Sequence, residues 1–153
     1  MQAAIVTNLD QLKTLVGKDI GVSPWTAITQ EQVDAFAEAT GDRQWIHCDP
    51  TRAAKDSPYG ATVAHGLLTL SIGPACIEAM VRLEGCRLVV NYGLNRVRFP
   101  NAVRVGARLR MHLKLLELND FEGGVQATLL QTFELEGAAK PACIAELLLR
   151  YYL

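Results

Sequence analysis

The segment from Ala61 to Ile77 constrains the fold most, because it contains no Asp, Glu, Lys or Arg. We expect a helix that begins near His65–Gly66 and continues to about Leu83. Its first three turns carry almost no polar side chains, and a helix that is apolar on all sides is normally buried on all sides. Gly73–Pro74 lies inside it, and the missing backbone donor of proline predicts a kink or a restart there. The same glycine, proline and polar residues argue against a membrane span.

After Gly85 the hydrophobic period changes to two, which is typical of strands. Leu109, Met111 and Leu113 alternate with basic or polar residues, as in a strand with one buried face. The sequence predicts strands over residues 89–99, 108–115, 125–135 and 143–152, and a weaker strand over residues 20–28. Gly123–Gly124 indicates a hairpin, and such short connections favour antiparallel neighbours. The expected fold class is therefore α+β, with an antiparallel five-stranded sheet wrapped around one long central helix.

Length and composition fit this layout. The chain has 153 residues, of which 50% are hydrophobic, so we expect a single domain over residues 1–153 with a sizeable core. The net charge of −1 argues against a protein that binds nucleic acid through bulk charge. The N-terminus has no basic flank followed by an apolar block, which predicts no signal peptide and a cytoplasmic protein. The four cysteines form no CxxC pair and are interpreted as free thiols.

Two shorter helices are predicted upstream of the central one. Thr29 and Gln32 form a capping box before a helix over residues 30–40, and Gly41 is suited to end it because glycine readily takes a positive φ. Asp49 followed by Pro50 is typical of another helix start, opening a short helix over residues 51–55. The stretch between these two helices is expected to be non-helical, and a turn is expected at residues 57–60.

Residues suited to chemistry lie between Gly41 and Gly66. Asp42 and His47 are five residues apart, so a carboxylate and an imidazole could converge on one water, although a turn-capping Asp42 and a merely packed His47 would give the same spacing. At Gly66, backbone N–H groups without intrahelical partners would begin the buried helix, which suits an oxyanion hole. This combination fits chemistry on a carbonyl compound. Cys48 follows His47, but no second cluster supplies metal ligands, so no metal is expected.

Basic residues are concentrated between Arg82 and Lys114, where Glu84 is the only acidic residue. This segment is either a solvated sheet face or a groove for an anionic ligand, such as the phosphates of a nucleotide-bearing cofactor. Aromatic residues are not interleaved with the cations, which argues against binding of single-stranded nucleic acid.

Two runs of sequence, TGDRQWIHCDPTRAA and PYGATVAHGLLTLS, resemble the MaoC-like (R)-specific enoyl-CoA hydratase family, also called hydratase 2. The residues that match its signature are Gly41, Asp42, Ile46, His47, Ala53 and Ala64–His65–Gly66. The later run NYGLNRVRFPNAVRVGARLR resembles the strand that follows the central helix in that family. Gln44 and Trp45 stand where the family has Asn and Pro, and the QWIH variant is similar to its NodN-like branch.

The resemblance implies a hot-dog fold, normally a homodimer whose two sheets join edge to edge. It also implies acyl-CoA thioester substrates and reversible, (R)-specific hydration of a trans-2-enoyl-CoA to an (R)-3-hydroxyacyl-CoA. Coenzyme A then arrives only as part of the substrate, and no other cofactor, nucleic acid or membrane partner is expected. The implied catalytic residues are Asp42, His47 and Gly66. The expected substrate-binding residues are Gln44, Trp45, Tyr59, His65, Arg96 and Arg98.

In the expected mechanism, Asp42 and His47 hold one water. The Asp42 carboxylate accepts a proton as that water attacks C3, a proton reaches C2 through His47, and the Gly66 N–H stabilises the thioester oxygen. Two alternatives stay open. A hot-dog thioesterase would hydrolyse the same kind of substrate with a carboxylate on or near the helix. A non-catalytic acyl-CoA-binding subunit would need no chemistry, and the intact Asp42–His47 pair argues against it.

Overall fold

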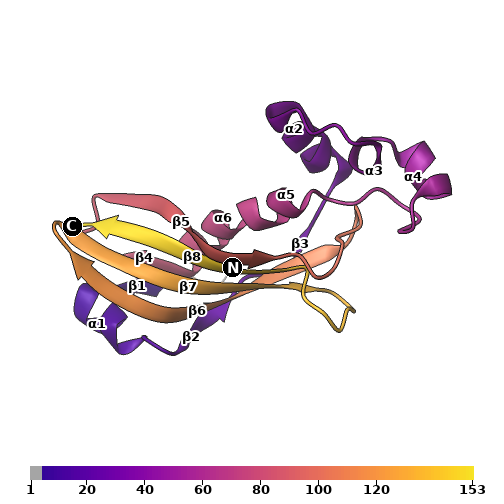
Figure 1. Cartoon of the computed structure of the whole chain (residues 1–153). Helices are drawn as coiled ribbons and strands as arrows, with labels where there is room; N and C mark the ends of the chain where they lie inside the picture. Colours follow the sequence, from indigo (N-terminus) through magenta and orange to yellow (C-terminus); the bar gives the residue numbers. More distant parts are fainter. Residues whose placement is uncertain (1–4) are drawn as a thin grey trace.

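The computed structural model describes residues 5–153 and shows an antiparallel sheet curving around a broken helix (Figure 1). The sheet has six strands, with β2, β6, β7, β8 and β5 side by side in that order and β3 also paired to β6. Their bounds are Asp19–Val22 for β2, Thr26–Ala27 for β3, Leu88–Arg98 for β5, Arg108–Phe121 for β6, Gly124–Leu135 for β7 and Cys143–Tyr152 for β8. The predicted α+β layout is confirmed. Residues 1–4 lie outside the described residues. They begin the N-terminal segment that is predicted to contain no signal peptide.

The weak strand predicted over residues 20–28 is two short strands, β2 and β3. Pro24 lies between them and has no N–H to give to the sheet. The neighbouring Ser23 keeps the pairing to β6 continuous: its N–H donates to the Met111 carbonyl at 2.9 Å, and its Oγ accepts the Met111 N–H at 2.8 Å. A side chain therefore replaces part of the backbone ladder at this point.

The central helix is divided into α5 (Gly66–Ser71) and α6 (Gly73–Met80). The expected restart at Gly73–Pro74 is confirmed, and a Cβ at position 73 would collide with Oε1 of the buried Gln131. The expected extension to Leu83 is wrong. Residues Val81–Leu83 form β4, which pairs in parallel with β1 (Ile5–Thr7), a contact between distant parts of the chain.

The expectation that the central helix is buried all round is also wrong for the single chain. The sheet covers the side of the helix that carries Thr69, Gly73 and Ile77, all of them buried. Leu67 on the other side is 61% exposed. Further exposed apolar side chains lie on the edge strand β5, namely Leu88, Val89, Tyr92 and Leu94.

The core lies on the concave side of β6, β7 and β8. The predicted alternation on β6 is confirmed, since Leu109, Met111, Leu113 and Leu115 are each at most 1% exposed. Phe133 on β7 is completely buried among them. Helix α1 (Leu9–Thr14), capped by Asn8, contributes Leu12 to the same core.

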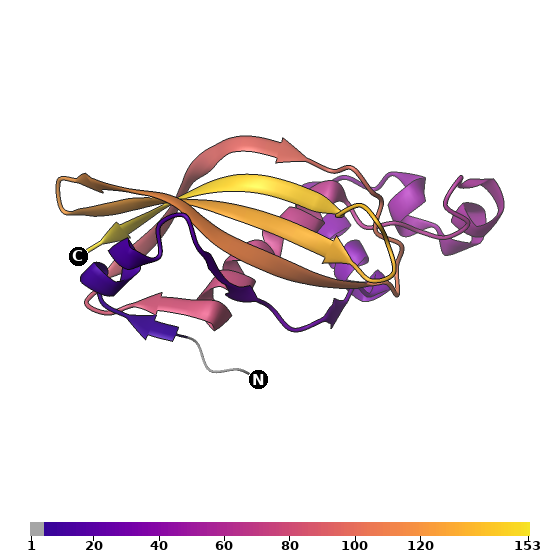
Figure 2. The same ribbon diagram turned by 90° about the horizontal axis from the view of Figure 1, so that it is seen from below.

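Three helices project beyond one end of the sheet in both views (Figures 1 and 2). They are α2 (Gln30–Thr40), α3 (Trp45–Cys48) and α4 (Pro50–Asp56). The Thr29 capping box and the left-handed Gly41, with φ of 78°, bound α2 as predicted. None of the helices in residues 5–153 is long and apolar enough to cross a membrane.

Candidate active site

Asp42 lies on the loop that leaves α2, directly after Gly41 turns the chain away from the helix axis. Its side chain is exposed. Oδ1 accepts the Gln44 N–H at 3.4 Å, so the carboxylate does cap a local turn. Carboxylates that cap turns in this way keep lone pairs free for other partners.

His47 lies on α3, so the prediction that this stretch is non-helical is wrong. Its side chain is 8% exposed. Nδ1 lies 2.7 Å from the Val63 carbonyl oxygen, and because a carbonyl only accepts, Nδ1 is the donor. In the neutral ring the proton is therefore on Nδ1, and Nε2 keeps a free lone pair.

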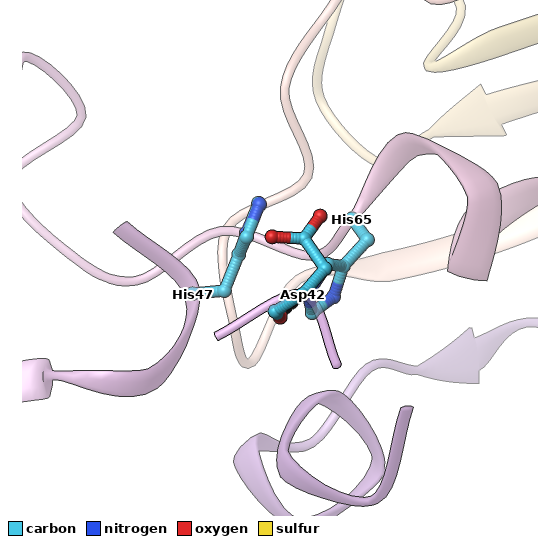
Figure 3. Close-up of side chains that lie close together, drawn as sticks. All are labelled: Asp42, His47 and His65. Carbon is cyan, nitrogen blue, oxygen red and sulfur yellow. Dashed lines mark hydrogen bonds between the residues drawn. The ribbon is translucent and has the colours of Figure 1, made fainter. Parts of the chain in front are cut away.

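His65 lies just before α5 and contacts both Asp42 and His47 (Figure 3). Its Nε2 donates to the backbone carbonyl of Asp42 at 2.9 Å. Its ring stacks on that of His47, with centroids 3.8 Å apart and planes inclined by 28°. One polar side-chain atom from each of Asp42, His47 and His65 lies within 4.8 Å of the other two.

A clamp that the sequence analysis missed holds α3 in place. Nε2 of Gln30 donates to the His47 carbonyl at 2.8 Å, and its Oε1 accepts the Thr62 hydroxyl at 2.6 Å. Gln30 is the first residue of α2, where the sequence shows only an ordinary helix start. The local pattern carried no signal for it, because both partners are distant in the chain.

Gly66 follows His65 and is the first residue of α5. None of the hydrogen bonds found within residues 5–153 uses its N–H. A Cβ at this position would lie 3.0 Å from the ring of Phe99, the residue that follows β5, so a side chain here would fit only if that exposed ring shifted slightly. The N–H is thus one residue from the stacked imidazoles.

The donor atoms of Asp42, His47 and His65 lie close enough together to hold a metal ion. Each imidazole already gives one ring nitrogen to a backbone carbonyl, so one nitrogen on each ring and the Asp42 carboxylate are the ligands that this cluster could offer. Cys48 is not suited to attack as a nucleophile, because burial raises the pKa of its thiol and the charges of Asp34 and Asp42 raise it further.

The other expected substrate-binding residues lie around this cluster or away from it. Gln44 is exposed beside Asp42. Trp45 is half-buried on α3, and the Arg52 guanidinium of α4 lies 4.3 Å from its ring centroid. Tyr59 lies in the turn after α4 and is 37% exposed. None of these three side chains belongs to the Asp42–His47–His65 cluster.

The arginines of the basic segment fall into two groups. Arg110 pairs with Glu134 at 2.6 and 3.0 Å, and Arg108 pairs with Glu136 at 3.0 Å. Hydrogen bonds from Arg110 and His112 lower the pKa of Glu134, so this carboxylate stays charged and neutralises Arg110. Arg96 and Arg98, in contrast, are exposed on β5, and no ion pair found in residues 5–153 includes them.

Known proteins are similar to this chain in sequence and in architecture. Residues 11–133 match the family model described as a MaoC like domain. The 3-hydroxyacyl-thioester dehydratase Z of Mycobacterium tuberculosis is 50% identical over 141 residues, covering 92% of this chain and 93% of the relative. Nodulation protein N of Rhizobium leguminosarum bv. viciae is 39% identical over 141 residues, covering 90% and 87%.

The fold is also found among solved structures. The structure of R-hydratase PhaJ1 from Pseudomonas aeruginosa superposes with a TM-score of 0.69 at 23% identity, covering 90% of this chain and 81% of that one. At this identity the likeness concerns the fold.

Proposed function

Because this chain belongs to the MaoC-like family, we propose that it is a hydratase/dehydratase that adds water reversibly to a trans-2-enoyl-CoA and gives an (R)-3-hydroxyacyl-CoA. The 3-hydroxyacyl-thioester dehydratase at 50% identity supports dehydration of this class of thioester. The likeness to nodulation protein N agrees with the QWIH variant at residues 44–47.

The observation that carries the proposal is the free Nε2 of His47 in one cluster with the Asp42 carboxylate and His65, the residue that directly precedes Gly66. Hydration of an enoyl thioester needs a group that takes a proton from water, a group that returns a proton to C2, and a donor for the thioester oxygen. We assign the first two roles to His47 and Asp42, which lie in one cluster, and the third to the N–H of Gly66, which follows His65 of that cluster.

The tautomer of His47 refines the expected proton path. Nδ1 carries the hydrogen that bonds to the Val63 carbonyl, so Nε2 has none to give in the neutral ring. We therefore propose that Nε2 takes a proton as the water oxygen bonds to C3, while Asp42 holds the other hydrogen of that water. The imidazolium then delivers a proton from Nε2 to C2, so one water is added and the pair returns to its starting state.

Charge develops on the thioester oxygen when C3 is attacked, and we assign the Gly66 N–H to stabilise it. This donor has no competing acceptor among the described hydrogen bonds. Removing a single oxyanion donor from an enzyme typically costs about 3–4 kcal/mol of transition-state stabilisation. No metal or redox cofactor takes part in the proposed reaction, in which nothing is oxidised.

One assay tests the proposal against both alternatives. Purified protein is mixed with crotonyl-CoA and longer trans-2-enoyl-CoA homologues, and the absorbance of the enoyl thioester is followed together with free thiol. Loss of the enoyl band without thiol release, and formation of the (R)-3-hydroxy product on a chiral column, is expected. Thiol release would favour a thioesterase, and binding without any absorbance change would favour a non-catalytic subunit.

We propose that Arg96 and Arg98 contact the phosphates of the coenzyme A portion. Among the ion pairs of the described residues, glutamates neutralise Arg108 and Arg110 but not Arg96 or Arg98, and Arg98 precedes Phe99, whose ring packs on Gly66. Arg98→Gln should raise KM about two- to fivefold and leave kcat unchanged, as expected when an exposed charge contact is lost. Arg110→Gln is the matched control and should leave KM unchanged.

A substrate without the nucleotide phosphates tests whether Arg98 contacts those phosphates. With a pantetheine thioester that lacks the nucleotide phosphates, Arg98→Gln and the unmodified protein should have the same KM. An equal KM increase with both substrates would place Arg98 against another part of the substrate.

We also propose a homodimer. The edge strand β5 exposes Val89 and Tyr92, and α5 exposes Leu67 on the side that the sheet does not cover. Several exposed apolar side chains along one edge of a sheet favour a protein–protein interface there.

Sedimentation at micromolar concentration should give twice the 16.7-kDa chain mass. Val89→Glu should shift the protein toward monomer, whereas Val16→Glu, at another exposed valine after α1, should not. A monomeric unmodified protein would contradict the proposal.

A further inference from the structure

We infer that His65 is a positioning residue that holds the Asp42 loop and the His47 ring in one fixed arrangement. The inference rests on the proposed hydration, because it assigns His65 an effect on the turnover of that reaction. It also differs from the expected role in substrate binding. The two contacts that carry it are the hydrogen bond to the Asp42 carbonyl and the stacking on His47.

The first contact is important because Asp42 is otherwise held only locally. Its N–H lies 3.4 Å from the Thr40 hydroxyl, and its Oδ1 accepts the Gln44 N–H. In residues 5–153, the bond from His65 Nε2 is the one hydrogen bond found between Asp42 and a distant segment. Without it, an exposed loop residue would have to present its carboxylate to the substrate with no anchor to the rest of the fold.

The second contact restricts the His47 ring. The bond from Nδ1 to the Val63 carbonyl fixes one edge of the imidazole but leaves rotation about that bond. The His65 ring, stacked at 3.8 Å, covers one face and limits this rotation, which sets the direction of the Nε2 lone pair.

Both contacts come from one short segment that is itself fixed. Val63 and His65 flank Ala64, whose N–H donates to the Val103 carbonyl at 2.7 Å. The His65 ring is 3% exposed, and the Phe36 ring of α2 lies 5.0 Å from it, centroid to centroid. Segment 63–65 therefore positions the acid–base pair and the Gly66 N–H together.

Three substitutions separate the two contacts. His65→Gln keeps a side-chain donor for the Asp42 carbonyl and loses the ring. His65→Phe keeps the ring and loses the donor, and His65→Leu loses both. Because a displacement of about 1 Å costs roughly 100-fold in rate, we expect His65→Leu to lower kcat about 100-fold and the other two about tenfold each. KM should change less than about twofold, because His65 acts through Asp42 and His47.

Imidazole nitrogen NMR gives a readout that does not depend on turnover. The chain has three histidines, and His112→Gln removes the surface histidine of β6, which simplifies assignment and serves as the control with unchanged kcat. In the unmodified protein, His47 should show the pure Nδ1–H tautomer. In His65→Leu it should show a mixture of tautomers, with His65→Phe intermediate.

The outcomes distinguish this inference from the proposed function. Unchanged kcat in all three variants of an active protein, or a rise in KM without a fall in kcat, would overturn the positioning role. An unmodified protein that does not hydrate enoyl thioesters, but whose His47 tautomer still responds to His65→Leu, would contradict the proposed function and support the positioning. If His65→Leu does not fold, the Gln and Phe variants decide: a tenfold fall in kcat with little change in KM supports the positioning role, and an unchanged kcat in both overturns it.

Discussion

Replacing Asp42 by Asn, or His47 by Asn, should lower kcat for enoyl-CoA hydration by about 10²–10⁴-fold. Asp42→Asn keeps Oδ1 as acceptor for the Gln44 N–H and keeps the backbone carbonyl that His65 binds, so it removes only the charge. His47→Asn places an amide N–H near the position of Nδ1, facing the Val63 carbonyl, and removes Nε2. Stopped-flow or steady-state absorbance at the enoyl band measures the loss.

The controls for this result are matched residues outside the site. Asp10→Asn on α1 and His112→Gln on β6 likewise remove a carboxylate charge and an imidazole, but on the surface, and should keep full activity. Circular dichroism and the thermal midpoint of all four variants should match the unmodified protein. A rate close to that of the unmodified protein in either site variant, with the fold intact, would remove that residue from the mechanism.

The second large effect is expected at Gly66. Gly66→Pro removes the backbone N–H, and kcat should fall about 10²–10³-fold, as for other lost oxyanion donors. The backbone tolerates the change, because Gly66 is the first helical residue and His65 has φ of −58° and ψ of 138°, the extended conformation that a following proline requires. A loss of rate therefore reports the missing donor and not a missing helix start.

Gly66→Ala is the control for crowding. Its Cβ would lie 3.0 Å from the Phe99 ring, as part of the proline ring does, but it keeps the N–H. Phe99 is 42% exposed, so its ring can move aside. We expect kcat of the alanine variant to stay within a few-fold of that of the unmodified protein. Equal rates in the proline and alanine variants would show that the N–H is not used.

The elements that could be predicted from the sequence are those fixed by neighbouring residues. Helix α2 is bounded by its own capping box and by Gly41, and the β6–β7 hairpin by its glycine pair and alternating pattern. Distant contacts could not be predicted. Residues 81–83 continue the apolar pattern of α6, yet they form β4 because β1 pairs with them.

The site divides in the same way. Asp42, His47 and Gly66 could be proposed because their spacing and chemistry are visible along the chain. The stacking of His65 on His47 and the Gln30–Thr62 clamp could not, because they join residues 18 and 32 positions apart. The same limit applies to the basic segment, where Glu134 and Glu136 on the neighbouring strand neutralise Arg110 and Arg108.

Helices α2–α4 project beyond the sheet, and this part of the chain carries His47 on α3 and Asp42 on the loop between α2 and α3, whereas Gly66 begins the helix that packs on the sheet (Figure 1). Few apolar side chains secure the projection, chiefly Val33, Ala37 and Ala53, so it should open more readily than the sheet. Local unfolding of this region, and not global unfolding of the core, then limits how long the protein stays active. Stabilising substitutions should therefore be placed first in residues 28–63. Stabilising the sheet would raise the melting temperature but leave the half-life of activity unchanged.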